Sequence, residues 1–234
     1  LIVASKIGYG KKTTLAFFNS ITGEKKGVIH EVGVVFNATS FSPNGHWLVS
    51  VNGDGTIQLF DLVDGNIHNL AEMKEDYYGI AQRRINWSVT SDAIVAAVAF
   101  SPEGRIFAAA PISYDIELWD ICSRKKFAEL AGHGGVVNDL AFSPNGKLLA
   151  SASDDGTIRI WRDVHQQKRS KYMGHEDTVT GCKFFPDSDQ IVSCSEDGFI
   201  KVWDYSKTQE LVMIGSDSVS SFPCFQKTIA LFFV

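Results

Sequence analysis

The sequence lacks the features that mark metal-binding, disulfide-rich and membrane proteins. Its four cysteines form no C-x-x-C pair, so neither a zinc site nor a disulfide framework is indicated, and a reducing compartment is expected. The longest apolar run, Ala93–Phe100, has eight residues, whereas a membrane-spanning helix needs about 20. We therefore expect no metal, no cofactor and no membrane insertion.

A start signal and a secretion signal are also lacking. The chain begins with Leu1, and its first apolar stretch, residues 1–4, is too short for the core of a signal peptide. We expect the sequence to be part of a longer polypeptide in the cytoplasm or nucleus.

The sequence has fewer positively charged residues than negatively charged ones. The 234 residues include 22 Lys and Arg against 27 Asp and Glu, a net charge of -5. Nucleic-acid binding depends on many cations that neutralise phosphates, so nucleic acid is expected only as an indirect partner. We interpret the basic run 168–171 as a solvated outer strand. Hydrophobic residues make up 44% of the chain, enough for the core of a globular protein.

An internal repeat is present. The pattern Phe-Ser-Pro-x-Gly occurs at residues 41–45, 100–104 and 142–146, with a degraded copy at 184–188. The intervals between these Phe residues are 59, 42 and 42, and an aromatic residue follows each Phe by 19 positions. These aromatics are Phe60, Trp119, Trp161 and Trp203. Four units therefore share one spacing.

Each unit predicts a small antiparallel sheet. Apolar and polar residues alternate, as in Thr157-Ile-Arg-Ile-Trp161. This period of two residues is typical of a β-strand. Asp-Gly pairs at 54–55, 155–156 and 197–198 predict hairpin turns. Gly-His pairs at 132–133 and 174–175 precede two units. A unit of about 42 residues with these marks predicts a four-stranded meander.

The units resemble WD40 repeats, which implies an all-β fold, a WD40-type β-propeller. We expect full four-stranded blades at about 34–70, 93–130, 135–172 and 177–214, and partial blades at 1–33 and 217–234. A seven-bladed ring needs about 290 residues at this period, so the remaining blades would lie outside this sequence.

The resemblance implies a buried hydrogen-bond network in two blades. Its members are His133, Ser151, Asp155 and Trp161 in one blade, and His175, Ser193, Asp197 and Trp203 in the next. Although Ser, His and Asp also form acyl-transfer triads, a set repeated every 42 residues favours a structural device, and we predict no catalytic residue. The earlier units depart from the pattern at Val32, Phe60, Ser91, Ala109 and Ser113.

An insertion lengthens the first interval. From Phe60 to Phe100 there are 40 residues where the later units need 23, so we predict an insertion at about 71–92, between an outer strand and the next inner strand. It holds residue types enriched at interface hot spots, namely Tyr77, Tyr78, Arg83, Arg84 and Trp87. Two interpretations stay open: the insertion docks a partner on the face that carries the Gly-His loops, or it covers its own degenerate blade.

The resemblance also implies partner contacts on this Gly-His face. The matching positions are Val136, Asn138 and Asp154 in one blade and Thr178, Thr180 and Glu196 in the next. The preceding blade has Ile94, Ala96 and Ile112 there, an apolar set that must be covered by a partner or by the insertion.

The leading hypothesis is a non-catalytic scaffold or interaction module that docks proteins within a larger multi-subunit assembly. One alternative is a regulatory or sensor array of a larger signalling protein, or a ubiquitin-ligase substrate receptor. A less favoured alternative is a propeller enzyme with an active site in its channel, because no cluster of His or carboxylates recurs on the predicted inner strands.

Overall fold

The computed structural model describes residues 2–7, 12–19, 21–32, 36–52, 55–61, 85–90, 94–162, 168–186, 189–207 and 209–215. The regular elements in these ranges are β-strands, with no helix among them, and accordingly no membrane-crossing helix was found in this part of the chain. Two compact units make up the chain, residues 1–95 and 96–234.

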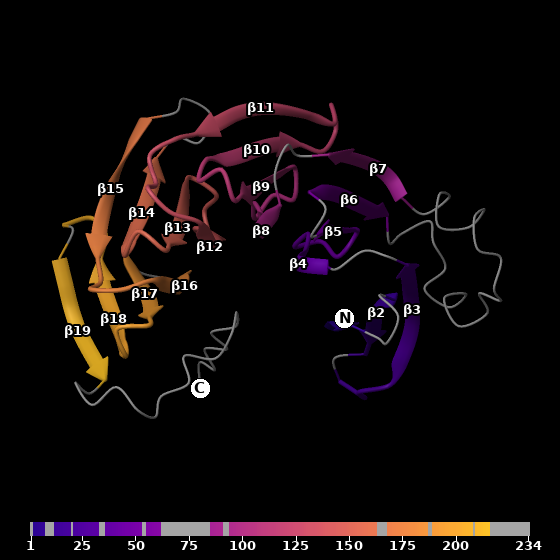
Figure 1. Ribbon diagram of the computed structural model, residues 1–234, viewed down its shortest axis with the longest axis horizontal. Helices are drawn as coiled ribbons and strands as arrows, with labels where there is room; N and C mark the ends of the chain where they lie inside the picture. The colour runs from indigo at the N-terminus through magenta and orange to yellow at the C-terminus, as the bar shows by residue number, and fades with distance from the viewer. Residues whose placement is uncertain are drawn as a thin grey trace. The chain divides into compact units, whose positions relative to one another are not determined.

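The strands form antiparallel sheets whose strand order follows the chain (Figure 1). The first sheet has three strands: β1 (Ile2–Ile7), β2 (Lys12–Phe18) and β3 (Lys25–Val32). The second has four: β4 (Phe36–Phe41), β5 (Trp47–Asn52), β6 (Thr56–Asp61) and β7 (Ile85–Thr90). The third consists of β8 (Val95–Phe100), β9 (Ile106–Pro111), β10 (Ile116–Asp120) and β11 (Lys125–Leu130).

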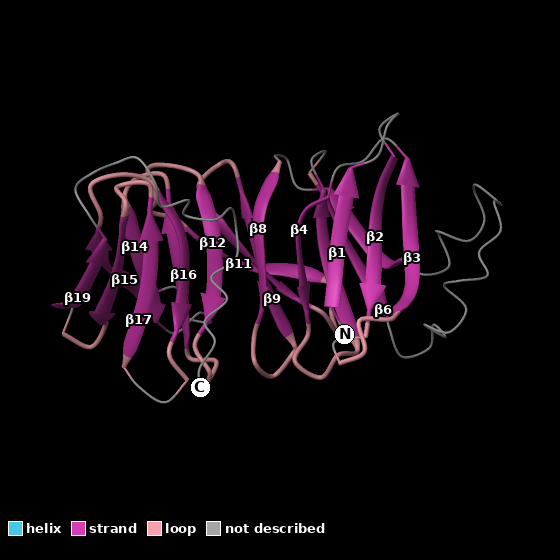
Figure 2. Ribbon diagram, turned by 90° about the horizontal axis from the view of Figure 1, so that it is seen from below, coloured by secondary structure: helices cyan, strands magenta, loops and turns pink. Residues whose placement is uncertain are grey.

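Two further four-stranded sheets complete the described chain. One consists of β12 (Val137–Phe142), β13 (Leu148–Ser153), β14 (Thr157–Arg162) and β15 (Lys168–Gly174). The other consists of β16 (Val179–Phe184), β17 (Gln190–Ser195), β18 (Phe199–Asp204) and β19 (Gln209–Gly215). Strands run up and down within each sheet (Figure 2). The prediction of an all-β fold built from WD40-type meanders is confirmed, and the seven-bladed ring stays a prediction.

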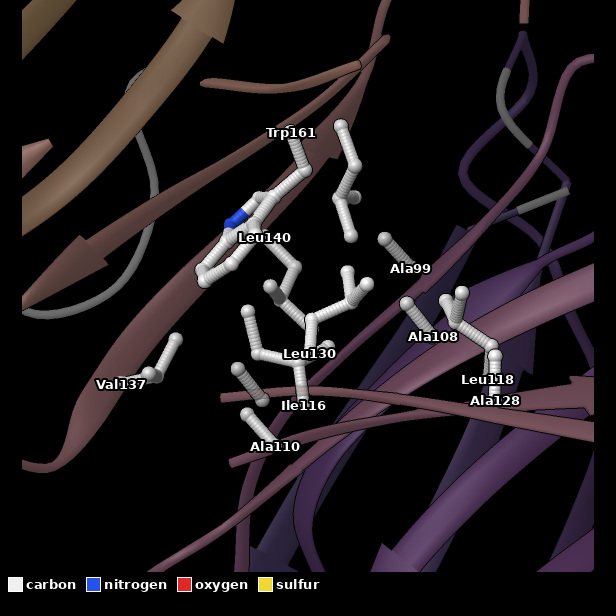
Figure 3. Close-up of a cluster of buried hydrophobic side chains, with 12 residues drawn as sticks. Ala99, Ala108, Ala110, Ile116, Leu118, Ala128, Leu130, Val137, Leu140 and Trp161 are labelled. Carbon is white, nitrogen blue, oxygen red and sulfur yellow. The ribbon is translucent and has the colours of Figure 1, made fainter. Parts of the chain in front are cut away.

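Apolar faces of neighbouring sheets pack together in the second unit. Between the sheets β8–β11 and β12–β15, the cluster in Figure 3 joins small and branched side chains. It contains Ala97, Ala99, Ala108, Ala110, Ile116, Leu118, Ala128 and Leu130 from one sheet and Val137, Leu140, Leu149 and Trp161 from the other. Burying one Leu or Ile side chain contributes about 1.5 to 3 kcal/mol, so this packing is a main source of stability.

The same kind of packing joins the sheets β12–β15 and β16–β19. Ile158 and Ile160 of β14 are fully buried there, with Ile191 of β17. At the next equivalent position the described part of the chain provides less cover: Ile200 of β18 is 43% exposed and Ile214 of β19 is 59% exposed. The sheet β16–β19 therefore presents an apolar face to solvent.

Several boundaries differ from the prediction or lie beyond the description. The fourth strand of the second sheet is β7, which pairs with β6 from Thr56 opposite Thr90 to Phe60 opposite Ile85. The blade placed at 34–70 thus continues to Thr90, and the extra residues lie between its third and fourth strands. The three strands of the first sheet fall within the partial blade placed at 1–33. The partial blade placed at 217–234 lies outside the described residues.

Candidate functional site

A hydrogen-bonded set of four side chains ties the loop before β12 to the interior of its sheet. His133 Nδ1 lies 2.8 Å from Asp155 Oδ2, and His133 Nε2 lies 2.7 Å from Ser151 Oγ. Trp161 Nε1 donates to the same Ser151 oxygen at 2.8 Å. The loop, the turn between β13 and β14, and both of these strands are thereby joined at one point.

The next sheet repeats this geometry. His175 Nδ1 lies 2.7 Å from Asp197 Oδ2, and His175 Nε2 lies 2.8 Å from Ser193 Oγ. Trp203 Nε1 donates to Ser193 Oγ at 2.8 Å. We call these two sets the tetrads. The structure brings together all eight residues that the resemblance to WD40 repeats places in them.

The direction of each hydrogen bond follows from the partners. A carboxylate only accepts, so Nδ1–H of each His donates to its Asp. The other ring nitrogen, Nε2, then accepts from the serine O–H, and the serine oxygen accepts from the indole. Ser151 and Ser193 are both fully buried, so a substrate carbonyl has no access to either hydroxyl.

The charge states agree with these directions. Burial lowers the pKa of His133 and His175, outweighing the carboxylate beside each ring. Burial raises the pKa of Asp155, but hydrogen bonds from Thr157, the Gly134 N–H and His133 outweigh it and lower the pKa to about 2. At neutral pH each tetrad therefore holds a neutral His and an ionised Asp.

The tetrads hold the loops and turns of the Gly-His face in fixed positions. The Gly134 N–H donates to Asp155 Oδ2 at 2.9 Å, and the Asp154 N–H donates to the Val136 carbonyl at 2.9 Å. The Glu196 N–H makes the corresponding bond to the Thr178 carbonyl at 2.9 Å. Because the backbone is held, the exposed side chains of Asp154 and Glu196 project from an ordered surface.

Two of the predicted partner residues instead make internal contacts. Asn138 Nδ2 donates to Asp154 Oδ1 at 2.7 Å and to the Val179 carbonyl of the next sheet at 3.2 Å. Thr180 Oγ1 donates to the Cys194 carbonyl at 3.3 Å. Asn138 and Thr180 thus have a role within the protein, and the Asn138 contact also engages one oxygen of Asp154.

The three apolar residues predicted as partner contacts at the sheet β8–β11 differ in how exposed they are. Ile94 is 44% exposed and Ile112 is 40% exposed, whereas Ala96 is half-buried. Ile112 belongs to the turn between β9 and β10, at the position that Asp154 and Glu196 occupy in the following sheets.

The structure corrects the predicted location of the insertion. The stretch between Asp61 and Ile85 joins β6 to β7, and β6 ends at Asp61, opposite Trp47, at the far end of the sheet from the Gly55 turn. The Gly55 turn corresponds to the Asp-Gly turns of the Gly-His face, so the expectation that the insertion opens on this face is wrong. The physical reason is that an outer strand must pair with the third strand, and Ile85–Thr90 makes that pairing.

The predicted hot-spot residues of the insertion are only partly described. Tyr77, Tyr78, Arg83 and Arg84 lie outside the described residues. Trp87 lies on β7 with its backbone opposite Leu59, so it belongs to a strand and not to the inserted loop. The docking role of the inserted residues stays a prediction.

The sheet β8–β11 replaces its missing tetrad with a different contact. Ala109 and Ser113 stand at the Ser and Asp positions, and Trp119 Nε1 donates instead to Glu117 Oε2 at 3.1 Å. Lys126 Nζ pairs with Glu117 Oε1 at 3.1 Å. Sequence reasoning missed Glu117, although a signal was present: Arg159 and Lys201 hold the same place two residues before the tryptophans.

Comparison with protein-family models identifies repeats that overlap the sheets described above. The model described as "WD domain, G-beta repeat" matches residues 23–61, 124–162 and 166–204, which together make up half of the chain. Each match begins beside an outer strand and ends with the third strand of the next sheet. Comparison with curated proteins gave no match. Among the described residues, no group of three or more His, Cys, Asp or Glu could hold a metal ion.

Proposed function

The chain belongs to the WD40 repeat family, and from this membership we propose that it is a non-catalytic scaffold module that docks other proteins within a larger assembly. WD40 repeats indicate a protein-interaction or scaffold module in general. The proposal adds that docking occurs on the Gly-His face of the sheets β12–β15 and β16–β19.

The observation that carries this proposal is the pair of tetrads. Each tetrad ties a loop of the Gly-His face to buried serine and tryptophan residues. A surface that is ordered before binding loses little conformational freedom when a partner docks, and this favours affinity. Exposed carboxylates lie on this surface: Glu196 faces solvent, and Asp154 is exposed although one of its oxygens accepts from Asn138.

The chemistry of the tetrads supports a non-catalytic role. A nucleophilic serine needs an open path to substrate and a nearby oxyanion site. Here Ser151 and Ser193 are fully buried, and each oxygen already lies between a histidine and an indole. The Ser, His and Asp of each tetrad are the residue types of a catalytic triad, but here they stabilise the fold.

The test is affinity purification of the tagged full chain from cell extract, followed by mass spectrometry and size-exclusion chromatography. We expect a defined set of proteins that co-elute with the chain in fixed stoichiometry. Glu196→Lys, a charge reversal on the Gly-His face, should remove them. A matched reversal, Lys147→Glu in the exposed turn between β12 and β13, should not.

Two results would contradict the proposal. If the chain elutes alone, without stoichiometric partners, it is not a scaffold. If both charge reversals leave the partners bound equally, docking uses another surface.

A further inference from the structure

The turn between β9 and β10 has a strained backbone. Tyr114 has a φ of 77°, in the left-handed region, whereas the equivalent residues of the next two sheets are Gly156 and Gly198, with φ of 77° and 86°. The turn itself is the same, since the N–H of Tyr114 bonds to the Pro111 carbonyl as Gly156 bonds to Ser153. A bulky side chain is disfavoured in this conformation, and such strain is found mainly at functional positions.

Two large side chains of this turn, those of Ile112 and Tyr114, face solvent. Ile112 is 40% exposed and Tyr114 is 42% exposed. No tetrad holds them, because Ala109 and Ser113 replace two of its members. The turn therefore departs from its counterparts both in its strain and in the apolar surface that it offers. We call Ile112 and Tyr114 the apolar tip.

The apolar tip lies beside the Gly-His face of the next sheet. Ala110 and Ile116, which flank the turn, pack in one cluster with Val137 at the start of β12 (Figure 3). Val136, the residue before Val137, accepts the N–H of Asp154. The apolar tip and the exposed Asp154 thus lie at the same end of two packed sheets.

Charge is divided between the two ends of the sheets in the second unit. At the Gly-His end, the described loops 111–115, 131–136, 153–157, 175–178 and 195–199 contain no Lys or Arg. Their carboxylates are Asp115, Asp154, Asp155, Glu176, Asp177, Glu196 and Asp197. The described loops at the opposite end contain four cations, Arg105, Arg124, Lys147 and Lys207, and two carboxylates, Glu103 and Asp189.

We propose that the apolar tip is a docking site for a basic segment of a partner protein, one in which an apolar side chain lies next to Lys or Arg. The apolar side chain covers Ile112 and Tyr114, and the cations meet the carboxylates on the adjoining loops. Opposite charges bring partners together and like charges exclude wrong ones, so an acidic segment or a nucleic-acid backbone does not fit. This inference rests on the proposed docking function and names its partner class.

The test uses short random peptides displayed on phage and selected against the full chain. Selected peptides should be rich in Lys and Arg around one apolar residue. Synthesised and measured by fluorescence anisotropy, they should bind about tenfold or more weakly to a chain with Ile112→Ser and Tyr114→Gly, since hot-spot anchors carry effects of this size. Added salt should weaken the binding to the unchanged protein.

A matched control and a stability measurement separate docking from a structural role. Phe127 on β11 is also 40% exposed, and Phe127→Ser should leave peptide binding unchanged. Tyr114→Gly places glycine where the neighbouring sheets have it, so the urea midpoint should not fall. A lower midpoint together with unchanged binding would mean that Tyr114 acts only within the fold and would overturn the inference.

Other results also overturn it: selection of acidic or uncharged peptides, or selection of none. The proposed function fails separately, through the absence of stoichiometric partners in the purification described above. If those partners are recovered while the peptide results go against the apolar tip, the chain is still a scaffold but binds elsewhere.

Discussion

At the scale of single residues, Asp197 illustrates what a tetrad carboxylate does. Its side chain is 6% exposed and accepts from His175 Nδ1 at 2.7 Å, the Phe199 N–H at 2.9 Å and the Glu176 N–H at 3.1 Å. Asp197→Ala leaves these donors without their acceptor. We expect the free energy of unfolding to fall by about 1 to 3 kcal/mol, the cost of unpaired buried groups, measured by urea titration.

The neighbouring residue provides the control. Glu196 is exposed, and Glu196→Ala should change the free energy of unfolding by no more than about 0.5 kcal/mol. Equal losses for the two variants would show that the carboxylate of Asp197 is not held as the structure has it.

The tetrads also predict how stability depends on pH. The folded protein lowers the pKa of His133, His175 and Asp155, the last to about 2. In acid the unfolded chain therefore binds more protons than the folded one, and stability falls as pH decreases. The free energy of unfolding should begin to fall near pH 6.5, which is about the ordinary pKa of histidine. It should fall again between about pH 4 and pH 2, where Asp155 is protonated more readily in the unfolded chain than in the folded one.

Thermal melting across this pH range measures the effect. His175→Gln should reduce this first loss of stability, because it removes one of the two histidines whose pKa the folded protein lowers among the described residues. A protein that melts at the same temperature from pH 7 to about 5 would contradict the assignment of neutral buried histidines.

At the scale of elements, Glu117 supports the strand β10 where the tetrad is missing. It accepts from Trp119 Nε1 and pairs with Lys126. Glu117→Ala leaves the buried indole N–H without this acceptor, and the free energy of unfolding should fall by about 1 to 3 kcal/mol. Glu117→Gln keeps an acceptor for the indole and loses only the charge, so its loss in a urea titration should be smaller.

The second partner of Lys126 gives the comparison. Glu129 lies 3.3 Å from Lys126 Nζ, and its side chain is 52% exposed. Exposed ion pairs contribute about 0 to 1 kcal/mol, so Glu129→Ala should have little effect. If it costs as much as Glu117→Ala, the role of Glu117 toward Trp119 is wrong.

The strand β7 shows where sequence reasoning fell short. The connection from an outer strand to the next inner strand is short in every described sheet. It spans four positions from Val32 to Phe36, five from Thr90 to Val95, seven from Leu130 to Val137 and five from Gly174 to Val179. Extra residues must therefore precede the outer strand. The prediction used the total interval alone and placed them after it. The alternation of apolar and polar residues in Ile85–Thr90 was the available signal.

The strain at Tyr114 could not be predicted in the same way. The spacing aligns Tyr114 with Gly156 and Gly198, but an insertion, a deletion or a different turn would have relieved the backbone. Only the coordinates show that the turn is kept and that tyrosine adopts a φ of 77°.

At the scale of the whole molecule, the packing of successive sheets gives residues at equivalent positions different degrees of burial. Ile158 is fully buried between two sheets, whereas Ile200, at the same place one sheet later, is 43% exposed. Ile158→Ala should cost about 2 to 5 kcal/mol, the range for large-to-small changes in a core. Ile200→Ala should cost clearly less, since part of its side chain already contacts water.

Urea titration of both variants makes the comparison direct, because the substitution is the same. Similar losses would indicate that the face carrying Ile200 is covered in solution. Melting that depends on protein concentration would then identify a second copy of the chain as the cover.

The fold was predictable because the repeat is visible in the sequence. One spacing placed Ser151, Asp155 and Trp161 on adjoining strands and a turn, and their antiparallel pairing then brings them together. The degenerate blade was harder, since Glu117 replaces the tetrad with a side chain from a position outside the repeated pattern. The contact occurs once, so the one signal for it was a carboxylate at the position where Arg159 and Lys201 stand in the following sheets.

The alanines between the sheets β8–β11 and β12–β15 have a consequence for the entropy of folding. Ala97, Ala99, Ala108, Ala110 and Ala128 belong to that cluster, and alanine has no rotamers to lose, whereas Met loses up to about 2 kcal/mol of rotamer freedom and Leu or Ile about 0.5 to 1. The cluster that includes Ile158, Ile160 and Met173 orders more flexible side chains. The blade that lacks a tetrad thus joins its neighbour at a small loss of side-chain freedom.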